Sequence, residues 1–181
     1  MHYKISVLAV CILGAAFSLS GENRKETAQG EIEANRRKFD YFFLESLKAK
    51  KSGKLDTAFE LLQHCYWIDS LNPQVLYEMS LYYRLFNNNS DVVATLQKAI
   101  ELEPSNFWYQ RLLASQCESM RQFETAIETY ENMIRTFPDK PELNYDLASL
   151  YAQNGNTEKA IDALNQLENI IGINETISIQ K

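Results

Sequence analysis

Glycine and proline are scarce in this sequence, which has 6 and 4 of them among 181 residues. A fold of many short strands needs turn residues at regular intervals, so this scarcity argues against an all-β chain. Apolar residues make up 45% and charged residues 23%, the balance of a folded protein rather than a disordered one. The composition therefore favours a folded, helical protein.

Histidine and cysteine are also rare, with 2 and 3 residues. His2 lies in the N-terminal segment, which leaves His64 as the only histidine of the main body, and no ligand set has the spacing of a metal site. The sequence has no glycine-rich phosphate loop and no nucleophile elbow. We therefore expect no enzyme activity, cofactor or metal in this stretch, although a catalytic domain beyond Lys181 stays open.

Basic residues are outnumbered, at 18 against 24 acids, giving a net charge of −6. Nucleic acid binding requires Lys and Arg to neutralise phosphates, so we expect no nucleic acid partner. Seven basic residues do lie between Arg36 and Lys54. A solvated face is the simple interpretation, and contact with anionic lipid or an acidic partner is the alternative.

The first twenty residues have the layout of a secretory signal. Lys4 precedes the weakly polar to apolar run Ile5–Leu19, and small residues at Ser18 and Ser20 precede Gly21. We expect residues 1–20 to be cleaved, which makes the protein exported, periplasmic or secreted, with no transmembrane span after cleavage. A retained anchor is the alternative, but a span needs about 20 apolar residues. Residues 21–30 are polar with two glycines and are predicted to be a flexible leader.

A 34-residue repeat is the main signal in the rest of the chain. Residues 94–104 and 125–138 match in pattern at this shift, and the register extends in both directions without insertion or deletion. It defines four units: 39–72, 73–106, 107–140 and 141–174. We number the positions of each unit from 1 to 34. Each unit is predicted to form two amphipathic helices joined by a short turn.

Small residues and turn residues recur at fixed positions of the unit. Position 8, where two helices approach closely, is small in every unit: Ser46, Ser80, Ala114 and Ala148. Gly53 and Gly155 occupy position 15, where a left-handed residue ends the first helix. Pro104 and Pro138 at position 32 stop the second helix. From Glu31 onward, a helix is predicted to run into the first unit.

These small positions, with the proline stop, resemble the tetratricopeptide repeat family over residues 39–174. The likeness is strongest in the third unit, at Leu113, Ala114, Phe123, Ala126, Tyr130 and Pro138. It is weaker at Glu45, where the family has a leucine, and at Asn87–Asn89, where it has a glycine and an aromatic residue. The resemblance implies an all-α fold, a right-handed α-solenoid of stacked antiparallel helical hairpins.

The resemblance also implies a function, the binding of a protein or peptide partner. In the family, first-helix positions 2, 5, 9, 12 and 13 line a concave groove that holds an extended peptide or a helix. In this chain they give the predicted groove residues Phe43, Leu47, Lys50, Tyr77, Leu81, Arg84, Trp108, Arg111 and Tyr145. The family's carboxylate clamp is absent, because its Lys and Asn positions hold Phe43, Leu47 and Glu78. Packing between neighbouring first helices is the simpler alternative for several of these residues.

A second hypothesis makes the chain a structural or assembly element. Residues 175–181 look like the start of a further helix that stops abruptly, and no polar capping helix follows the last unit. The last hairpin would then dock on another copy or a following domain, around Ile161, Leu164 and Ile170. The sequence could equally be the N-terminal repeat part of a longer protein. Cys65 and Cys117 lie two hairpins apart in this register, so we predict two buried free thiols.

Overall fold

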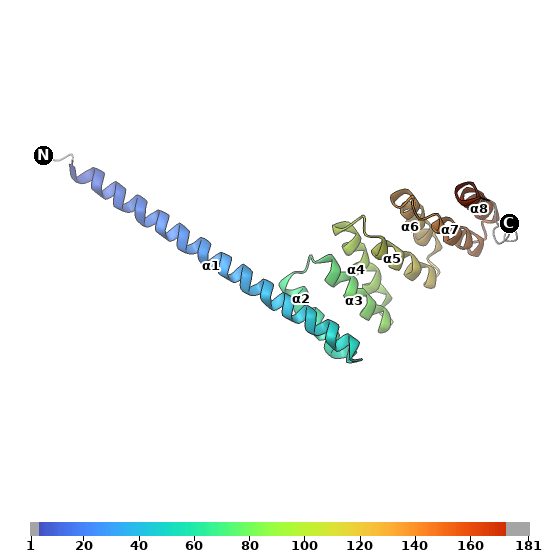
Figure 1. Cartoon of the computed structure of the whole chain (residues 1–181), viewed down its shortest axis with the longest axis horizontal. Helices are drawn as coiled ribbons and strands as arrows, with labels where there is room; N and C mark the ends of the chain where they lie inside the picture. Colours follow the sequence, from blue (N-terminus) through green and yellow to red (C-terminus); the bar gives the residue numbers. More distant parts are fainter. Residues whose placement is uncertain (1–3, 173–181) are drawn as a thin grey trace. The chain divides into compact units, whose positions relative to one another are not determined.

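The computed structural model describes the backbone of residues 4–172 and the side chains of residues 28–172. Over residues 4–172 the chain has eight α-helices and no strand, which confirms the all-α fold class (Figure 1). The helices are α1 (Lys4–Lys51), α2 (Leu55–Ile68), α3 (Pro73–Leu85), α4 (Asn89–Leu102), α5 (Phe107–Ser119), α6 (Phe123–Thr136), α7 (Glu142–Gln153) and α8 (Thr157–Ile171).

Two compact units divide the chain, Met1–Ile68 and Asp69–Lys181. In the first unit, α2 packs against the C-terminal part of α1, where the Cys65 thiol donates to the Phe39 carbonyl (3.8 Å). α1 has 48 residues and continues far beyond this hairpin towards the N-terminus (Figure 1).

The predicted flexible leader, residues 21–30, is part of α1. This segment contains no proline, and most of its residues are good helix formers, so its two glycines do not interrupt the helix. The proposed signal, residues 1–20, remains a prediction. The predicted start of a further helix, residues 175–181, lies outside the described residues. Among residues 28–172, whose side chains the structure describes, no helix is both long and apolar enough to cross a membrane.

Three stacked helical hairpins form the second unit: α3–α4, α5–α6 and α7–α8. α4 also contacts α5, and α6 contacts α7, so each second helix packs against the first helix of the next hairpin. The shared core extends from Val92 and Leu96 on α4 to Leu164 and Leu167 on α8. Position 8 is buried in all four repeat units, at Ser46, Ser80, Ala114 and Ala148.

Every first helix ends in the same left-handed turn at position 15. Gly53 and Gly155 have φ angles of 74° and 79°, as predicted, and Asn87 and Arg121 adopt the same conformation with φ 57°. In each case the following residue donates a backbone hydrogen bond to a carbonyl five residues earlier, for example Gln122 to Cys117 (2.9 Å). The turn is therefore set by the repeat, and Arg121 adopts it against the preference of a side-chain-bearing residue.

Asparagine side chains start four of the helices in the second unit, including α4, where Asn88 accepts from the Asp91 amide (3.4 Å). Asn72 accepts from the Val75 amide and Asn156 from the Lys159 amide, both at 3.2 Å. Asn106 accepts from the Trp108 amide, also at 3.2 Å. These bonds satisfy amides that have no partner within the helix. They fix where α3, α4, α5 and α8 begin and so which side chains each helix exposes.

Candidate interaction surfaces

The predicted groove residues belong to both compact units. Phe43, Leu47 and Lys50 lie on α1. The other six lie on the first helices of the second unit: Tyr77, Leu81 and Arg84 on α3, Trp108 and Arg111 on α5, and Tyr145 on α7. We describe each set within its own unit.

Trp108, Tyr145 and Arg84 are the exposed members of the second set. The Trp108 side chain is 65% exposed, and its ring meets the edge of Phe107 (centroids 5.3 Å apart). Phe107 packs against the core and so holds the first turn of α5 in place. Tyr145 lies partly exposed on α7, and Arg84 is exposed in the last turn of α3. Large exposed aromatic and Arg side chains are the residue types that anchor interfaces.

Tyr77 and Leu81 pack instead against neighbouring helices. Both are half-buried against the core of the second unit. The Tyr77 ring lies 5.0 Å from the ring of Tyr109 on α5, and Tyr109 is buried. Burial, together with the nearby Glu103 carboxylate, raises the pKa of Tyr109 to about 12. These contacts join α3 to α5, which is the packing role that the simpler interpretation assigns to them.

Arg111 also joins helices rather than facing solvent freely. Its guanidinium donates to the Asp146 carboxylate on α7 and to the Tyr130 hydroxyl on α6 (2.9 Å). Its carbon Cζ lies 5.4 Å from the Tyr130 ring centroid. Burial alone would lower the pKa of Arg111, but the Asp146 hydrogen bond and the surrounding acids raise it. Arg111 is therefore a structural contact, and only part of its side chain is accessible to a partner.

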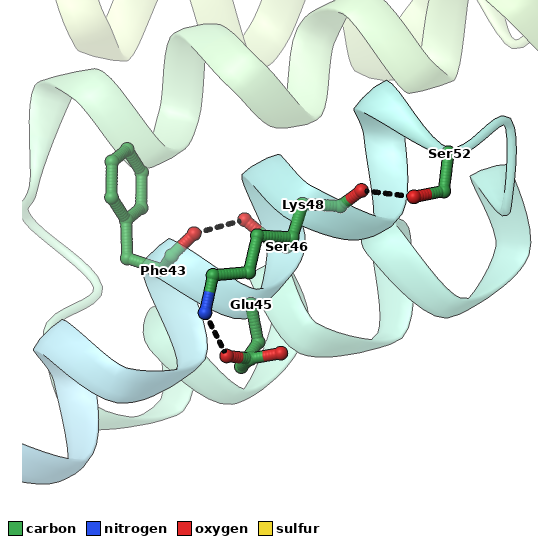
Figure 2. Close-up of polar contacts among 5 residues, drawn as sticks. All are labelled: Phe43, Glu45, Ser46, Lys48 and Ser52. Atoms are coloured by element: carbon green, nitrogen blue, oxygen red, sulfur yellow. Dashed lines mark hydrogen bonds and ion pairs between the residues drawn. The ribbon is translucent and has the colours of Figure 1, made fainter.

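In the first unit, the three groove residues differ in accessibility. The Phe43 ring is half-buried and lies parallel to Phe39, with centroids 6.0 Å apart. Leu47 and Lys50 are both exposed on α1. Figure 2 shows the backbone carbonyl of Phe43 accepting a hydrogen bond from Ser46 (2.7 Å), one turn further along α1.

Two contacts between first helices were not foreseen from the sequence. Asp146 pairs with Arg111, and the Gln153 amide donates to the Glu118 carboxylate (3.0 Å). Both join side chains of α5 and α7 that are 35 residues apart. A search for polar or opposite-charge pairs at one repeat plus one residue would have found both. They occupy part of the surface that the resemblance assigns to a partner.

A separate cavity of about 460 Å³ lies among α6, α7 and α8. Its lining includes none of the predicted groove residues. Tyr151 lines this cavity and donates to the Glu131 carboxylate (2.6 Å), and the Lys159 ammonium lies 5.3 Å from the Tyr151 ring centroid. Burial and Glu131 raise the pKa of Tyr151 to about 12. Three of the polar lining residues, Glu131, Tyr151 and Lys159, are thus engaged in contacts with one another.

The reactive or metal-binding residue types, cysteine and histidine, lie in packing positions. Cys65 and Cys117 are buried and free, as predicted, and burial raises the pKa of Cys65 to about 11 and also raises that of Cys117. Neither resembles an activated thiolate. His64 is stacked on Phe42 with centroids 4.8 Å apart. Among the described side chains, residues 28–172, no group of three His, Cys, Asp or Glu residues could hold a metal ion.

Comparison with known proteins agrees with this architecture. A family model for the tetratricopeptide repeat matches residues 119–170. No curated protein matches the chain. A crystal structure of the MamA protein is similar, with a TM-score of 0.64 and 20% identity over 74% of this chain and 73% of that one.

Two further MamA structures give the same result. MamA 41-end from Desulfovibrio magneticus RS-1 has a TM-score of 0.64 and 19% identity, covering 73% of this chain and 75% of its own. MamA AMB-1 has a TM-score of 0.65 and 21% identity over 78% of both chains. At this identity the likeness concerns the fold, the helical solenoid. The family match and the repeat register together show a tetratricopeptide repeat over residues 119–170, within a chain that has the helical-solenoid fold of these structures.

Proposed function

We propose that this chain is an exported interaction scaffold that binds a peptide or helix of a cell-envelope protein across α3, α5 and α7. The tetratricopeptide repeat fold is a scaffold for protein partners in general. The finer proposal rests mainly on Trp108, a large aromatic side chain left 65% exposed on a first helix. Because the hairpin stack is rigid, Trp108 is already held in place before a partner binds. Binding a partner there would therefore lose little conformational entropy.

Arg84 and Tyr145 support the same surface from the two neighbouring first helices. Tyr77, Leu81 and Arg111 have a different role in this proposal, because their contacts with Tyr109 and Asp146 hold the first helices in register. They shape the surface, and Trp108 with Arg84 binds the partner.

The experiment is a cross-linking capture from envelope extract with the full chain. It compares the parent with a Trp108→Ala/Arg84→Ala double variant and with Trp67→Ala. Trp67 is an equally exposed tryptophan on α2, outside the proposed surface, so it controls for loss of any exposed aromatic side chain. Helix content measured by circular dichroism confirms that all three are folded.

We expect the parent and Trp67→Ala to capture one common partner, and the double variant to lose it. Truncating an interface anchor costs about 2 kcal/mol or more, which is over tenfold in affinity. Capture of the same proteins by all three would place the binding surface elsewhere.

Export is a separate part of the proposal. It rests on the layout of Lys4, the run Ile5–Leu19 and the small residues before Gly21. N-terminal sequencing of the protein isolated from its own cells should begin at Gly21. A protein that keeps residues 1–20 would instead be anchored or not exported by this route.

A further inference from the structure

α1 exposes a face that is covered on the other first helices. Position 3 of the repeat unit is Tyr109 on α5 and Leu143 on α7, which are 5% and 0% exposed. At the same position of α1, Tyr41 is 60% exposed. α5 and α7 are covered by the second helix of the preceding hairpin, α4 and α6 respectively. The exposed face of α1 therefore corresponds to the surface that the second helix of a preceding hairpin covers on α5 and α7.

Four aromatic rings make this face continuous with α2. Tyr41 meets the edge of Phe42 (5.6 Å), Phe42 stacks on His64 (4.8 Å), and His64 meets the edge of Trp67 (4.9 Å between centroids). Trp67, at the end of this row, is 73% exposed. We call these four residues the head face. On α5–α6, the positions of Phe42 and His64 hold Gln110 and Asn132, which hydrogen-bond to each other.

Polar residues border the head face along α1. Figure 2 shows Lys48 donating to the Glu45 carboxylate (2.7 Å). Glu45 follows Phe42 by three residues along α1. Arg37 and Lys38 lie one turn before Tyr41 and Phe42, on the same side of the helix. Residues 36–54 contain seven basic and two acidic residues. An acidic helix with an apolar stripe would match this border.

α8 carries the complementary half of the repeat contact. In α4 and α6, positions 21 and 28 hold Val93, Ile100, Ile127 and Ile134, all half-buried against the core. The same positions of α8 hold Ile161 and Glu168, and its last turn exposes Ile170 and Ile171 (57% and 49%). We call Ile161, Glu168, Ile170 and Ile171 the tail face. Leu164, predicted to be exposed there, is buried inside its own hairpin.

The charges of the head face and the tail face are complementary, and the helix directions suit a contact between them. α8 contains three acids and one lysine. Because α6 is joined to α7 by a short loop, the last turn of α6 lies beside the first turn of α7. In the same arrangement, the last turn of α8 with Glu168 would lie beside Arg37, Lys38 and Tyr41 of another copy.

We propose that the protein associates with itself head to tail, the tail face of one copy covering the head face of the next. The contact repeats the packing of α4 on α5 and of α6 on α7 between two chains. It is heterologous, so it forms chains of copies unless the rotation closes a ring. The proposal uses α1, α2 and α8 and does not depend on partner binding through Trp108.

The test measures the mass of the full chain against concentration by sedimentation equilibrium. Three variants are compared with the parent: a head variant, Tyr41→Ser/Trp67→Ser; a tail variant, Ile170→Ser/Ile171→Glu; and Trp108→Ala as a control on an exposed aromatic elsewhere. The substituted side chains are exposed, so the variants should fold, which circular dichroism verifies. We expect the average mass of the parent and of Trp108→Ala to increase with concentration. Each face variant should have an association constant lower than that of the parent by about tenfold or more.

Mixing the head and tail variants distinguishes this arrangement from a symmetric dimer. The head variant keeps an intact tail and the tail variant an intact head, so their mixture should form a 1:1 dimer that grows no further. A second pair, Lys38→Glu and Glu168→Lys, should each weaken association, and the chain carrying both should recover it. A monomeric parent, face variants that associate like the parent, or a mixture without heterodimer would overturn the proposal.

Discussion

Arg111 on α5 and Asp146 on α7 form an ion pair that joins two successive repeat units. The Arg111 guanidinium also donates to the Tyr130 hydroxyl, so one side chain contacts both helices that follow α5. Packing along a helical stack is mostly apolar and tolerates sliding, whereas a charged hydrogen bond has a defined geometry. The pair therefore fixes the register of α5 against α7.

Replacing Arg111 by Ala should lower the free energy of unfolding by about 1 kcal/mol. Half-exposed ion pairs contribute little, but the substitution also removes the donor to Tyr130, whose side chain is buried. Urea unfolding measures the change. Arg84→Ala is the control, because its side chain is exposed on the same set of helices, and it should change stability by less than about 0.5 kcal/mol. A double-mutant cycle with Asp146→Ala that gives no coupling energy would contradict the role of the pair.

Arg121 offers a stabilising substitution. It has a φ of 57°, a conformation that costs a residue with a side chain about 1–2 kcal/mol and costs glycine little. Arg121→Gly should therefore raise the free energy of unfolding by about 0.5–1 kcal/mol. Gln122→Gly is the matched control, since Gln122 has φ −85° and glycine there only adds freedom to the unfolded chain. If both substitutions destabilise equally, the left-handed turn is not under strain.

Stability should fall in strong alkali because of buried tyrosines. Burial raises the pKa of Tyr130 to about 12, against 10.0 for an ordinary tyrosine. Above pH 10 the unfolded chain loses this proton while the folded chain keeps it, so stability is full below pH 10 and decreases towards pH 12. Urea unfolding between pH 9 and 11 should show a smaller loss for Tyr130→Phe than for the parent. Equal losses in the two proteins would show that Tyr130 ionises normally in the folded state.

Much of the fold could be predicted because the same structural position occurs once in each repeat unit, so each local sequence signal can be checked in several units. Position 15 illustrates this: Gly53 and Gly155 predicted a left-handed turn, and the structure has the same turn at this position in every unit, even at Arg121, where no prediction was made and no residue preference suggests it. Residues 21–30 show the opposite case. Two glycines in a polar segment indicated a flexible leader, but a helix propagates through isolated glycines when its neighbours are good helix formers.

The interaction surface could be predicted only in part. The family positions gave Trp108 and Tyr145, which are exposed, but they also gave Tyr77 and Arg111, which contact neighbouring helices. A position in a repeat specifies which way a side chain points and not what it meets there. The exposed Tyr41 was missed for a related reason: its position is a core position in every later unit, and in the first unit no helix among the described residues covers it.

The two buried cysteines, Cys65 and Cys117, should be unreactive in the folded protein. Cys65 and Cys117 lie on α2 and α5 and are fully buried, and burial raises the pKa of Cys65 to about 11, so at neutral pH the thiolate is almost absent. In a Cys11→Ser background, which leaves only Cys65 and Cys117, a thiol reagent such as Ellman's reagent should therefore label neither thiol until the chain unfolds in urea, when both should react. The Cys65→Ala variant separates the sites: its remaining thiol, Cys117, should become reactive with the unfolding of the α3–α8 unit, and Cys65 in the Cys117→Ala variant should report on the α1–α2 hairpin. Rapid labelling of Cys65 in native buffer would mean that this hairpin opens far more readily than its buried contacts indicate.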